Sequence, residues 1–406
     1  MHNTPTASYP GKHAAITLLA VSQTLAMSLW FSSSAVIGEM TAETEISPVR
    51  QAMLASGVQF GFAVGAIIYA ILGLADRYDP RRVLATSAAI AALANLSLLA
   101  SPIGSFEAIL ARILTGALLA GVYPVGMKIV VGWGQNDRGM LVGLLVGALT
   151  LGSAAPHLLA FLGGTDWRLT VAGASGLAFL GAAIGLLVGL GPHHARAHAF
   201  DPFAIVLAWK DQRIRLAYAG YLGHMWELYA FWAWIGAALT VAFSTHMAKT
   251  DATTLAKLTA FGVIGLGAFS SLAAGILADR IGKAETTIIA MIGSGSAAIA
   301  AAATFSFAPT LLIIVALLWG ACVIADSAQF SALVADFAPP ERAGTLLTLQ
   351  TALGFALTIA TVQSAPLAAE WLGWPALFLI LAIGPAFGTA AMARLVRLQR
   401  SSQPER

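Results

Sequence analysis

The sequence predicts an all-α membrane protein: twelve transmembrane helices in two six-helix pseudo-repeat bundles, with the N- and C-termini cytoplasmic. Three observations support this prediction. Hydrophobic residues make up 58% of the 406 residues and charged residues only 10%, whereas soluble proteins carry about 25% charged residues. Apolar runs long enough to cross a bilayer recur along the chain. A short charged turn also recurs, once in each half.

Composition and motifs exclude several other classes of protein. A net charge of +3 without a clustered basic face gives no reason to expect nucleic-acid binding. The single cysteine, Cys322, excludes an internal disulfide. The chain has no Gly-x4-Gly-Lys-Ser/Thr loop and no Cys/His cluster, so we expect no ATP use, cofactor, metal or enzymatic activity. The first apolar run, residues 14–38, exceeds the roughly 7–15 residues of a signal-peptide core, and we expect it to be retained.

A transmembrane helix needs roughly 20 mostly apolar residues. Twelve stretches qualify: 14–38, 51–75, 83–101, 106–132, 139–163, 169–191, 214–243, 255–278, 286–306, 309–336, 343–367 and 374–395. The longest internal polar segment, 192–213, is predicted to be a cytoplasmic loop between an N-terminal bundle, 1–191, and a C-terminal bundle, 214–406. Within it, residues 203–209 predict a short amphipathic helix on the inner membrane surface.

The distribution of lysine and arginine predicts the orientation. With the N-terminus inside, the inner segments hold 16 of these residues and the outer segments four. Positive residues are enriched in cytoplasmic loops, so both termini are expected on the cytoplasmic side. That arrangement requires an even number of spans.

Matching landmarks in the two halves indicate a duplication. Asp76 and Asp279 lie 203 positions apart (279 − 76), and Arg138 and Arg342 lie 204 apart (342 − 138). Both pairs open or close a predicted span at the same place in each half. A separate feature of the fifth span is a face of small residues, Gly139, Gly143 and Gly147, which we expect to pack closely against another helix.

The charged turns carry a resemblance to the major facilitator superfamily. Gly275, Asp279, Arg280, Gly282 and Lys283 match its signature between the second and third spans of a half. The first-half copy, residues 73–82, departs from the signature, because Gly73 is displaced by one position and Asp79-Pro80 replaces the second glycine. Arg112 to Gly116 resembles a further motif of this superfamily. Residues 121–128 and 220–227 loosely resemble a prokaryotic subgroup of anion and cyanate permeases.

This resemblance implies that the charged turns latch the two halves together on the cytoplasmic side in one conformation. A carboxylate at a helix end can face the positive N-terminus of a neighbouring helix. Simple anchoring by positive residues on the cytoplasmic side of the membrane is the alternative for the arginines. The predicted latch comprises Asp76, Arg77, Arg81, Arg82, Asp279, Arg280 and Lys283.

Ionisable residues inside the spans are few, and each costs roughly 2.5–3.5 kcal/mol to insert. Glu227, Asp326 and His224 are therefore the candidates for proton coupling. A carboxylate held permanently by neighbours for structure is the alternative. The candidates for substrate binding are Arg112, Tyr123, Lys128, Gln23, Trp30, Trp226, Gln329 and Gln350. Among these, Arg112 has structural pairing as its alternative, Lys128 has snorkelling to the interface, and the aromatic residues have packing.

These features predict a secondary active transporter. We expect it to move a small polar or anionic organic solute across the cell inner (plasma) membrane by alternating access, coupled to protons. Its expected partners are the solute, protons and the lipid bilayer, and we expect a monomer. The alternatives are drug or metabolite efflux driven by protons, and, from a different class, a membrane sensor that does not transport.

Overall fold

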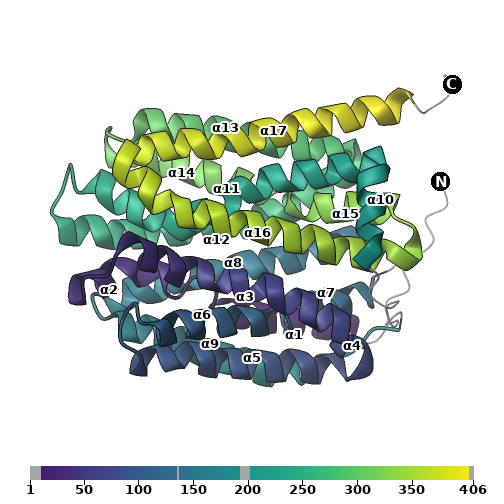
Figure 1. Cartoon of the computed structure of the whole chain (residues 1–406), viewed down its shortest axis with the longest axis horizontal. Coiled ribbons are helices and arrows are strands. Elements are labelled where there is room, and N and C mark those ends of the chain that lie inside the picture. The colour runs from purple at the N-terminus through teal and green to yellow at the C-terminus, as the bar shows by residue number, and fades with distance from the viewer. Residues whose placement is uncertain (1–10, 135–136, 193–201, 402–406) are drawn as a thin grey trace.

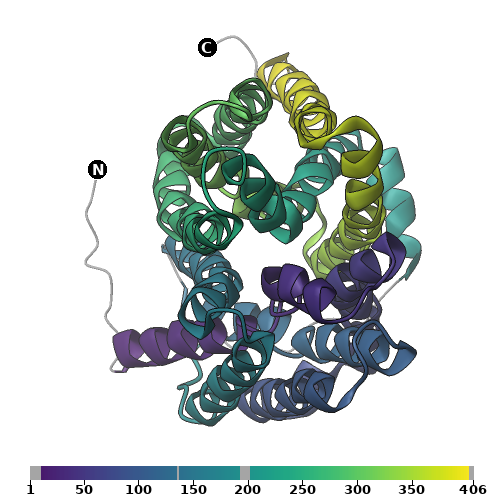
Figure 2. The same cartoon turned by 90° about the vertical axis from the view of Figure 1, so that its left-hand side faces the viewer.

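The computed structural model describes residues 11–134, 137–192 and 202–401, and all regular elements in these ranges are helices. Eleven helices of the described chain are long and apolar enough to cross a membrane. Helices α1–α9 lie together on one side of the molecule and helices α11–α17 on the other (Figure 1). The view along the helices shows the same two groups stacked on each other (Figure 2).

The helices of the first group follow the predicted spans closely, with the first span as the exception. Their bounds are α1 (Lys12–Met27), α2 (Ile37–Glu43), α3 (Pro48–Leu72), α4 (Leu74–Arg77), α5 (Pro80–Leu96), α6 (Phe106–Leu119), α7 (Tyr123–Val131), α8 (Arg138–Gly163) and α9 (Trp167–Gly185). Short 3-10 turns, η1 (Ser34–Val36) and η2 (Ser97–Ala100), precede α2 and extend α5.

The helices of the second group are longer and more regular. They comprise α11 (Gln212–Phe243), α12 (Lys249–Ile281), α13 (Lys283–Thr304), α14 (Pro309–Val323), α15 (Ser327–Phe337), α16 (Pro340–Leu372) and α17 (Trp374–Ser401). Between the groups, the 3-10 turn η3 (Pro202–Ala204) leads into α10 (Ile205–Lys210), which lies across the end of the molecule (Figure 1). The side chains of Phe203 and Trp209 are exposed there. Part of the predicted central loop, residues 193–201, lies outside the described residues.

The first predicted span, 14–38, is not one of the eleven long helices, because its helix ends at Met27. Residues 28–33 form turns before η1 and α2 continue the segment. Serine hydroxyls compete for backbone groups in helices, and Ser28, Ser32 and Ser33 lie in this stretch. Ser28 donates to the carbonyl of Ala174 at 3.0 Å, and Ser33 to that of Leu54 at 2.9 Å. The segment is therefore held by its neighbours rather than by a continuous helix.

Two seams join the groups: α8 packs along α12, and α3 packs along α16. The glycine face of α8 lies on the first seam. A Cβ on Gly147 would lie 3.0 Å from the carbonyl oxygen of Ala268, and one on Gly143 would lie 3.4 Å from that of Ser271. The prediction that these glycines permit close helix packing is confirmed.

The two charged turns use glycine and proline in different ways. Gly73 ends α3 with φ 58°, and Gly282 ends α12 with φ 105°, both in the left-handed region that glycine tolerates best. In the first turn the Asp79 carboxylate accepts a hydrogen bond from the backbone N–H of Arg81 at 3.0 Å and so caps α5, with Pro80 at its first position. The side chain of Arg81 also holds the pKa of Asp79 below its usual range. Asp79-Pro80 thus makes the bend that glycine makes in the second turn.

Candidate functional site

Three predicted spans are interrupted near their centres. The first breaks at residues 28–33, the fourth between Leu119 and Tyr123, and the tenth between Val323 and Ser327. The last two breaks are related by the offset of the repeat, since Tyr123 opens α7 and Asp326, 203 positions later, is the N-cap of α15. A broken helix leaves backbone carbonyls without partners, and inside a membrane these must be satisfied by protein.

Arg112 satisfies the break in the first span. Its guanidinium is fully buried on α6 and donates to the carbonyl oxygens of Leu29 at 3.1 Å and Trp30 at 2.6 Å. It also donates to the Ser32 hydroxyl at 3.0 Å and to the amide oxygen of Asn95 at 2.7 Å. A cation at the carboxyl end of α1 is favoured by the helix dipole as well. These bonds engage Nη1 and Nη2, the groups with which Arg112 was predicted to bind substrate.

Gln23 reaches the break in the fourth span, where it adds a second hydrogen bond to a carbonyl that already accepts from the backbone N–H of Gly126. Its side chain on α1 is fully buried, and its amide nitrogen donates to the carbonyl oxygen of Val122 at 2.9 Å. Its amide oxygen has no hydrogen-bond partner among the described residues. The first and fourth spans are therefore tied together at both breaks, since Arg112 on the fourth also donates to carbonyls of the first.

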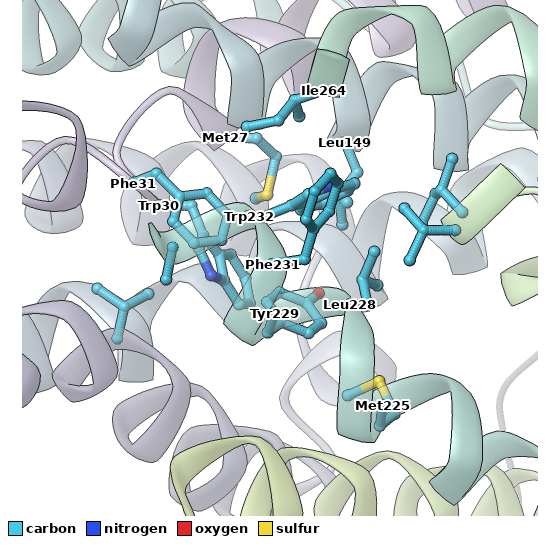
Figure 3. Packing of buried hydrophobic residues seen from close by; sticks show 14 of the residues in the cluster. Met27, Trp30, Phe31, Leu149, Met225, Leu228, Tyr229, Phe231, Trp232 and Ile264 are labelled. Carbon is cyan, nitrogen blue, oxygen red and sulfur yellow. The ribbon is translucent and has the colours of Figure 1, made fainter. Parts of the chain in front are cut away.

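Six aromatic rings meet where the two groups of helices face each other, and we call them the aromatic layer. Three come from the first group and three from the second: Trp30, Phe31, Phe62, Tyr229, Trp232 and Phe355. The ring centroids of Phe62 and Phe355 are 4.7 Å apart, and those of Trp30 and Tyr229 are 5.6 Å apart. Figure 3 shows Trp30, Phe31, Tyr229 and Trp232 gathered in this layer. Tyr123, which opens α7, is half-buried and packs against the hydrophobic core.

His224 and Asp326 form a buried pair in the second group. Nδ1 of His224 on α11 lies 2.8 Å from Oδ1 of Asp326, and both side chains are almost fully buried. Neither atom makes an aligned hydrogen bond, and Nε2 of His224 has no partner in the described chain. Tyr221 and Phe330 flank the imidazole, with centroids 6.1 Å and 5.7 Å from it. The two side chains are thus close enough to interact electrostatically, and no aligned hydrogen bond fixes their orientation.

Two predicted glutamines lie on helices next to this pair. Gln350 on α16 is 1% exposed, and neither atom of its side-chain amide has a partner among the described residues. Gln329 on α15 is also buried, one turn after Asp326. Buried polar atoms are normally paired with protein or water, so the unpaired amide of Gln350 is available to a ligand.

Glu227 has a different environment from His224, although the two lie three residues apart on α11. Its carboxylate accepts a hydrogen bond from the Ser294 hydroxyl at 2.6 Å and another from Nε1 of Trp319 at 2.7 Å. These partners lie on α13 and α14, so Glu227 is directed into the second group of helices. Trp226 is also held within this group, because its Nε1 donates to the carbonyl oxygen of Ile380 on α17 at 2.9 Å.

The predicted latch residues make contacts of two kinds. Within the first group Asp76 pairs with Lys128, and within the second Lys283 lies 2.5 Å from Asp336. Both pairs tie a charged turn to the fourth or tenth span of its own group. Across the groups, the Asp279 carboxylate lies against Gly139 in the first turn of α8, 3.5 Å from where a Cβ would be. Arg77, Arg82 and Arg280 are exposed, and Arg81 forms an ion pair with Asp79 at 2.7 Å.

Lys257 joins the two groups at the opposite end. It projects from α12 and donates to the carbonyl oxygens of Ala160 at 3.2 Å and Gly164 at 2.6 Å, at the end of α8. It also forms an ion pair with Glu39 of α2. On the other seam, the Gln363 amide on α16 donates to the Ser56 hydroxyl on α3 at 3.2 Å. We call the contacts of Lys257 and Gln363 the outer closure, after the predicted orientation.

The sequence of this chain matches the family model described as Major Facilitator Superfamily over residues 19–360. The chain belongs to the major facilitator superfamily. It is therefore a multi-pass membrane transporter, and the resemblance carried by the charged turns is confirmed. A search of curated proteins found no match to the sequence.

Solved structures of other superfamily members share the fold of this transporter. A point mutant of the nucleoside transporter NupG aligns with a TM-score of 0.69 at 14% identity, covering 94% of this chain and 99% of that one. A D-xylose-proton symporter aligns with a TM-score of 0.72 at 15% identity, covering 96% and 97%. The xylose transporter XylE from E. coli, in a partially occluded inward open conformation, aligns at 0.72 and 12% identity, covering 97% and 100%. Identities this low support the fold alone.

Sequence reasoning missed several residues that the transporter brings together. Five of the six aromatic rings were not singled out, because an apolar ring inside a span gives no signal of the face it occupies. Lys257 was counted among the four basic residues of the outer segments, although it lies inside α12, eight residues after the helix begins at Lys249. The available signal was a charged residue inside a long apolar run. The predicted span began at residue 255, so Lys257 was placed at the end of the helix, whereas α12 begins at Lys249.

Proposed function

We propose that this transporter is a secondary active transporter that couples the movement of a small polar organic solute to protons by alternating access. We further propose that it works as a monomer in the inner (plasma) membrane. The observation that carries the proposal is the His224–Asp326 pair, which lies beside a broken span. A buried ionisable pair of this kind is a candidate for function by default.

The pair is suited to taking up and releasing a proton. A histidine and a carboxylate 2.8 Å apart change their combined charge by one unit with each proton gained or lost. Because no aligned hydrogen bond fixes their state, binding of a polar solute nearby can change the cost of holding the proton. Only an interaction that differs between states shifts the populations of those states, and protonation provides such a difference here.

The distribution of fixed positive charge favours a polar solute without a net negative charge over an anion. Arg112 is occupied by two carbonyl oxygens. Lys128 and Lys257 are each paired with a carboxylate, Asp76 and Glu39. An anion bound between the groups of helices would have to displace one of these partners. The unpaired amide of Gln350 and the indole N–H of Trp30 require no such exchange.

The proposal is tested by proton flux into proteoliposomes that contain a pH-sensitive dye. Addition of a transported solute is expected to move protons in the wild-type protein and to move none in Asp326→Asn, with the variant still folded by thermal melting. Asp251→Asn is the matched control, because Asp251 is exposed in the first turn of α12. Solute-dependent proton flux that survives in Asp326→Asn would rule out coupling through this pair.

Efflux of amphipathic compounds is the second candidate function, and the aromatic layer is the observation that favours it. Six rings offer apolar surface to a drug-sized molecule. Susceptibility of cells that overexpress the protein separates the two functions. A broad gain in drug tolerance supports efflux, whereas proton flux with one class of small polar solute supports the first proposal.

A further inference from the structure

A second set of unpaired polar atoms lies between α8 and α11, apart from the His224–Asp326 pair. Ser153 and His157 are four residues apart on α8, and Trp232 and Gly236 are four apart on α11. Such spacing places each pair on one face of its helix. His157 and Gly236 meet, since a Cβ on Gly236 would lie 3.5 Å from Cε1 of the imidazole.

The two helices run in the same direction, because both are antiparallel to α12. Ser153 and Trp232 therefore lie at one level and His157 and Gly236 at the next. The side chains are 1%, 2% and 0% exposed for Ser153, His157 and Trp232. In the described chain, Oγ of Ser153, Nε2 of His157 and Nε1 of Trp232 have no hydrogen-bond partner.

Buried polar atoms without partners are costly, because they have given up their hydrogen bonds to water. On the same helix, the Thr150 hydroxyl donates a hydrogen bond to the carbonyl oxygen of Val146, one turn earlier, at 2.8 Å. The Ser153 hydroxyl makes no such bond. At Gly236 the imidazole of His157 lies against bare backbone, because a Cβ there would be in van der Waals contact with the ring. The unmet hydrogen bonds of the three side chains point to a bound group.

The chemistry of these atoms indicates which group. The indole of Trp232 only donates, whereas a serine hydroxyl and a neutral imidazole can each donate or accept. The nearest cation, Lys257, is held by Glu39 and by two carbonyl oxygens. Within the described chain, the region between α8 and α11 therefore offers both hydrogen-bond donors and acceptors but no unpaired cation.

We propose that Ser153, His157 and Trp232, beside the bare backbone of Gly236, form a substrate subsite that binds an uncharged hydrogen-bonding group, such as a hydroxyl or amide. This inference rests on the proposed transport function and names the substrate class. Trp232 connects the subsite to the aromatic layer, with ring centroids 5.8 Å from Tyr229 and 6.0 Å from Phe31. A solute in the subsite would thus contact the rings as well.

The experiment measures binding to the purified full-length protein, by thermal shift and then calorimetry. The probes are pentoses, hexoses, nucleosides and primary amides, with carboxylates and amines of similar size as the charged set. An uncharged probe is expected to stabilise the wild-type protein. Ser153→Ala and Trp232→Phe should each raise its Kd about tenfold, the effect of losing one hydrogen bond of about 1.4 kcal/mol. Stabilisation by charged probes alone, or by no probe, overturns the proposed class.

Matched controls separate binding from folding. Ser271→Ala removes an equally buried hydroxyl that already donates to the carbonyl oxygen of Gly267 at 2.8 Å. Trp234→Phe removes an indole N–H that donates to the carbonyl oxygen of Val362 at 3.0 Å. Both are expected to leave Kd unchanged.

An unchanged Kd in Ser153→Ala and Trp232→Phe would mean that ordered water, not solute, occupies the region between α8 and α11, and it would overturn the subsite. Binding that these variants weaken, without any proton flux on solute addition, would uphold the subsite and reject coupled transport.

Discussion

Each half of this transporter has a buried ionisable residue that contacts equivalent spans, and the two residues carry opposite charges. In the first half Arg112 on the fourth span meets Asn95 on the third and the carbonyls of the first. In the second half Glu227 on the seventh span meets Ser294 on the ninth and Trp319 on the tenth. The guanidinium supports a broken span, whereas the carboxylate sits on α11, which is continuous from Gln212 to Phe243.

This difference shows how duplicated bundles can diverge in role while keeping one scaffold. A break in the first span exposes carbonyl oxygens, and a fixed cation compensates for them. The seventh span has no break, so its half does not need a cation at the equivalent place. We therefore expect the ionisable residues of the second half to carry the proton chemistry.

The largest effect is expected from Arg112→Met, which would break the structural side of the comparison. The carbonyl oxygens of Leu29 and Trp30 would lose their charged donor inside the membrane. Hydrogen bonds to charged groups contribute about 1.5–3 kcal/mol each, so the free energy of unfolding should fall by about 3 kcal/mol or more. Thermal melting in detergent and fluorescence-detected size exclusion measure this. Arg112→Lys keeps the charge but loses the planar fork, and should recover only part of the stability.

The next effect concerns the second half. Glu227→Gln keeps the shape of the side chain and removes its charge, so the protein should fold while proton-driven uptake falls at least about tenfold. Uptake in proteoliposomes under an imposed pH gradient measures the loss. A protein that melts normally and transports at the wild-type rate would show that Glu227, like Arg112, is structural.

A smaller effect is expected at the outer closure. Lys257→Met removes the contacts to Glu39 and to the end of α8, so the population open at that end should rise by about tenfold. A cysteine introduced at Ser56, beneath the second seam, would react faster with a membrane-impermeant thiol reagent. The background is Cys322→Ser, because Cys322 is the only native cysteine. An unchanged labelling rate would argue that Lys257 does not help close this end.

The smallest effect is expected at an exposed ion pair, which contrasts with the buried Arg112 and Glu227. Glu43 and Arg168 pair at the molecular surface, 2.6 Å apart. Hydrogen bonds from Arg168, and then from Trp167, lower the pKa of Glu43 from 4.5 to about 2. A lowered folded pKa contributes stability above pH 4.5 that is lost as the pH falls toward 2. Because the pair is exposed, Glu43→Gln should change the melting temperature little at pH 7. A large drop at neutral pH would contradict this.

Much of this architecture could be predicted because it depends on composition along the chain. Long apolar runs and rare charges identify spans without knowledge of their neighbours, and they singled out Glu227 and Asp326. The break at residues 28–33 was not predicted, because its serines are small enough to pass within an apolar run. Its stability depends on Arg112, 83 residues after Leu29, whose partners include backbone carbonyls that leave no mark in the sequence.

Contacts across the two halves were the least predictable. Phe62 and Phe355 meet in the aromatic layer, yet each resembles any other phenylalanine in a span. The same holds for Ser153 and Trp232, which stand out only because their polar atoms have no hydrogen-bond partner in the described chain. Hydropathy reports how deep a residue lies along a span but not which face it occupies, and a site between bundles is defined by faces.

The bare face of α8 has a mechanical consequence. At Gly143 and Gly147 the helix meets α12 through backbone atoms, so no interlocking side chains oppose a small rotation of one helix on the other. We expect this seam to serve as the pivot during each cycle. The seam of α3 and α16, where Phe62 and Phe355 interlock, would then swing through the larger arc.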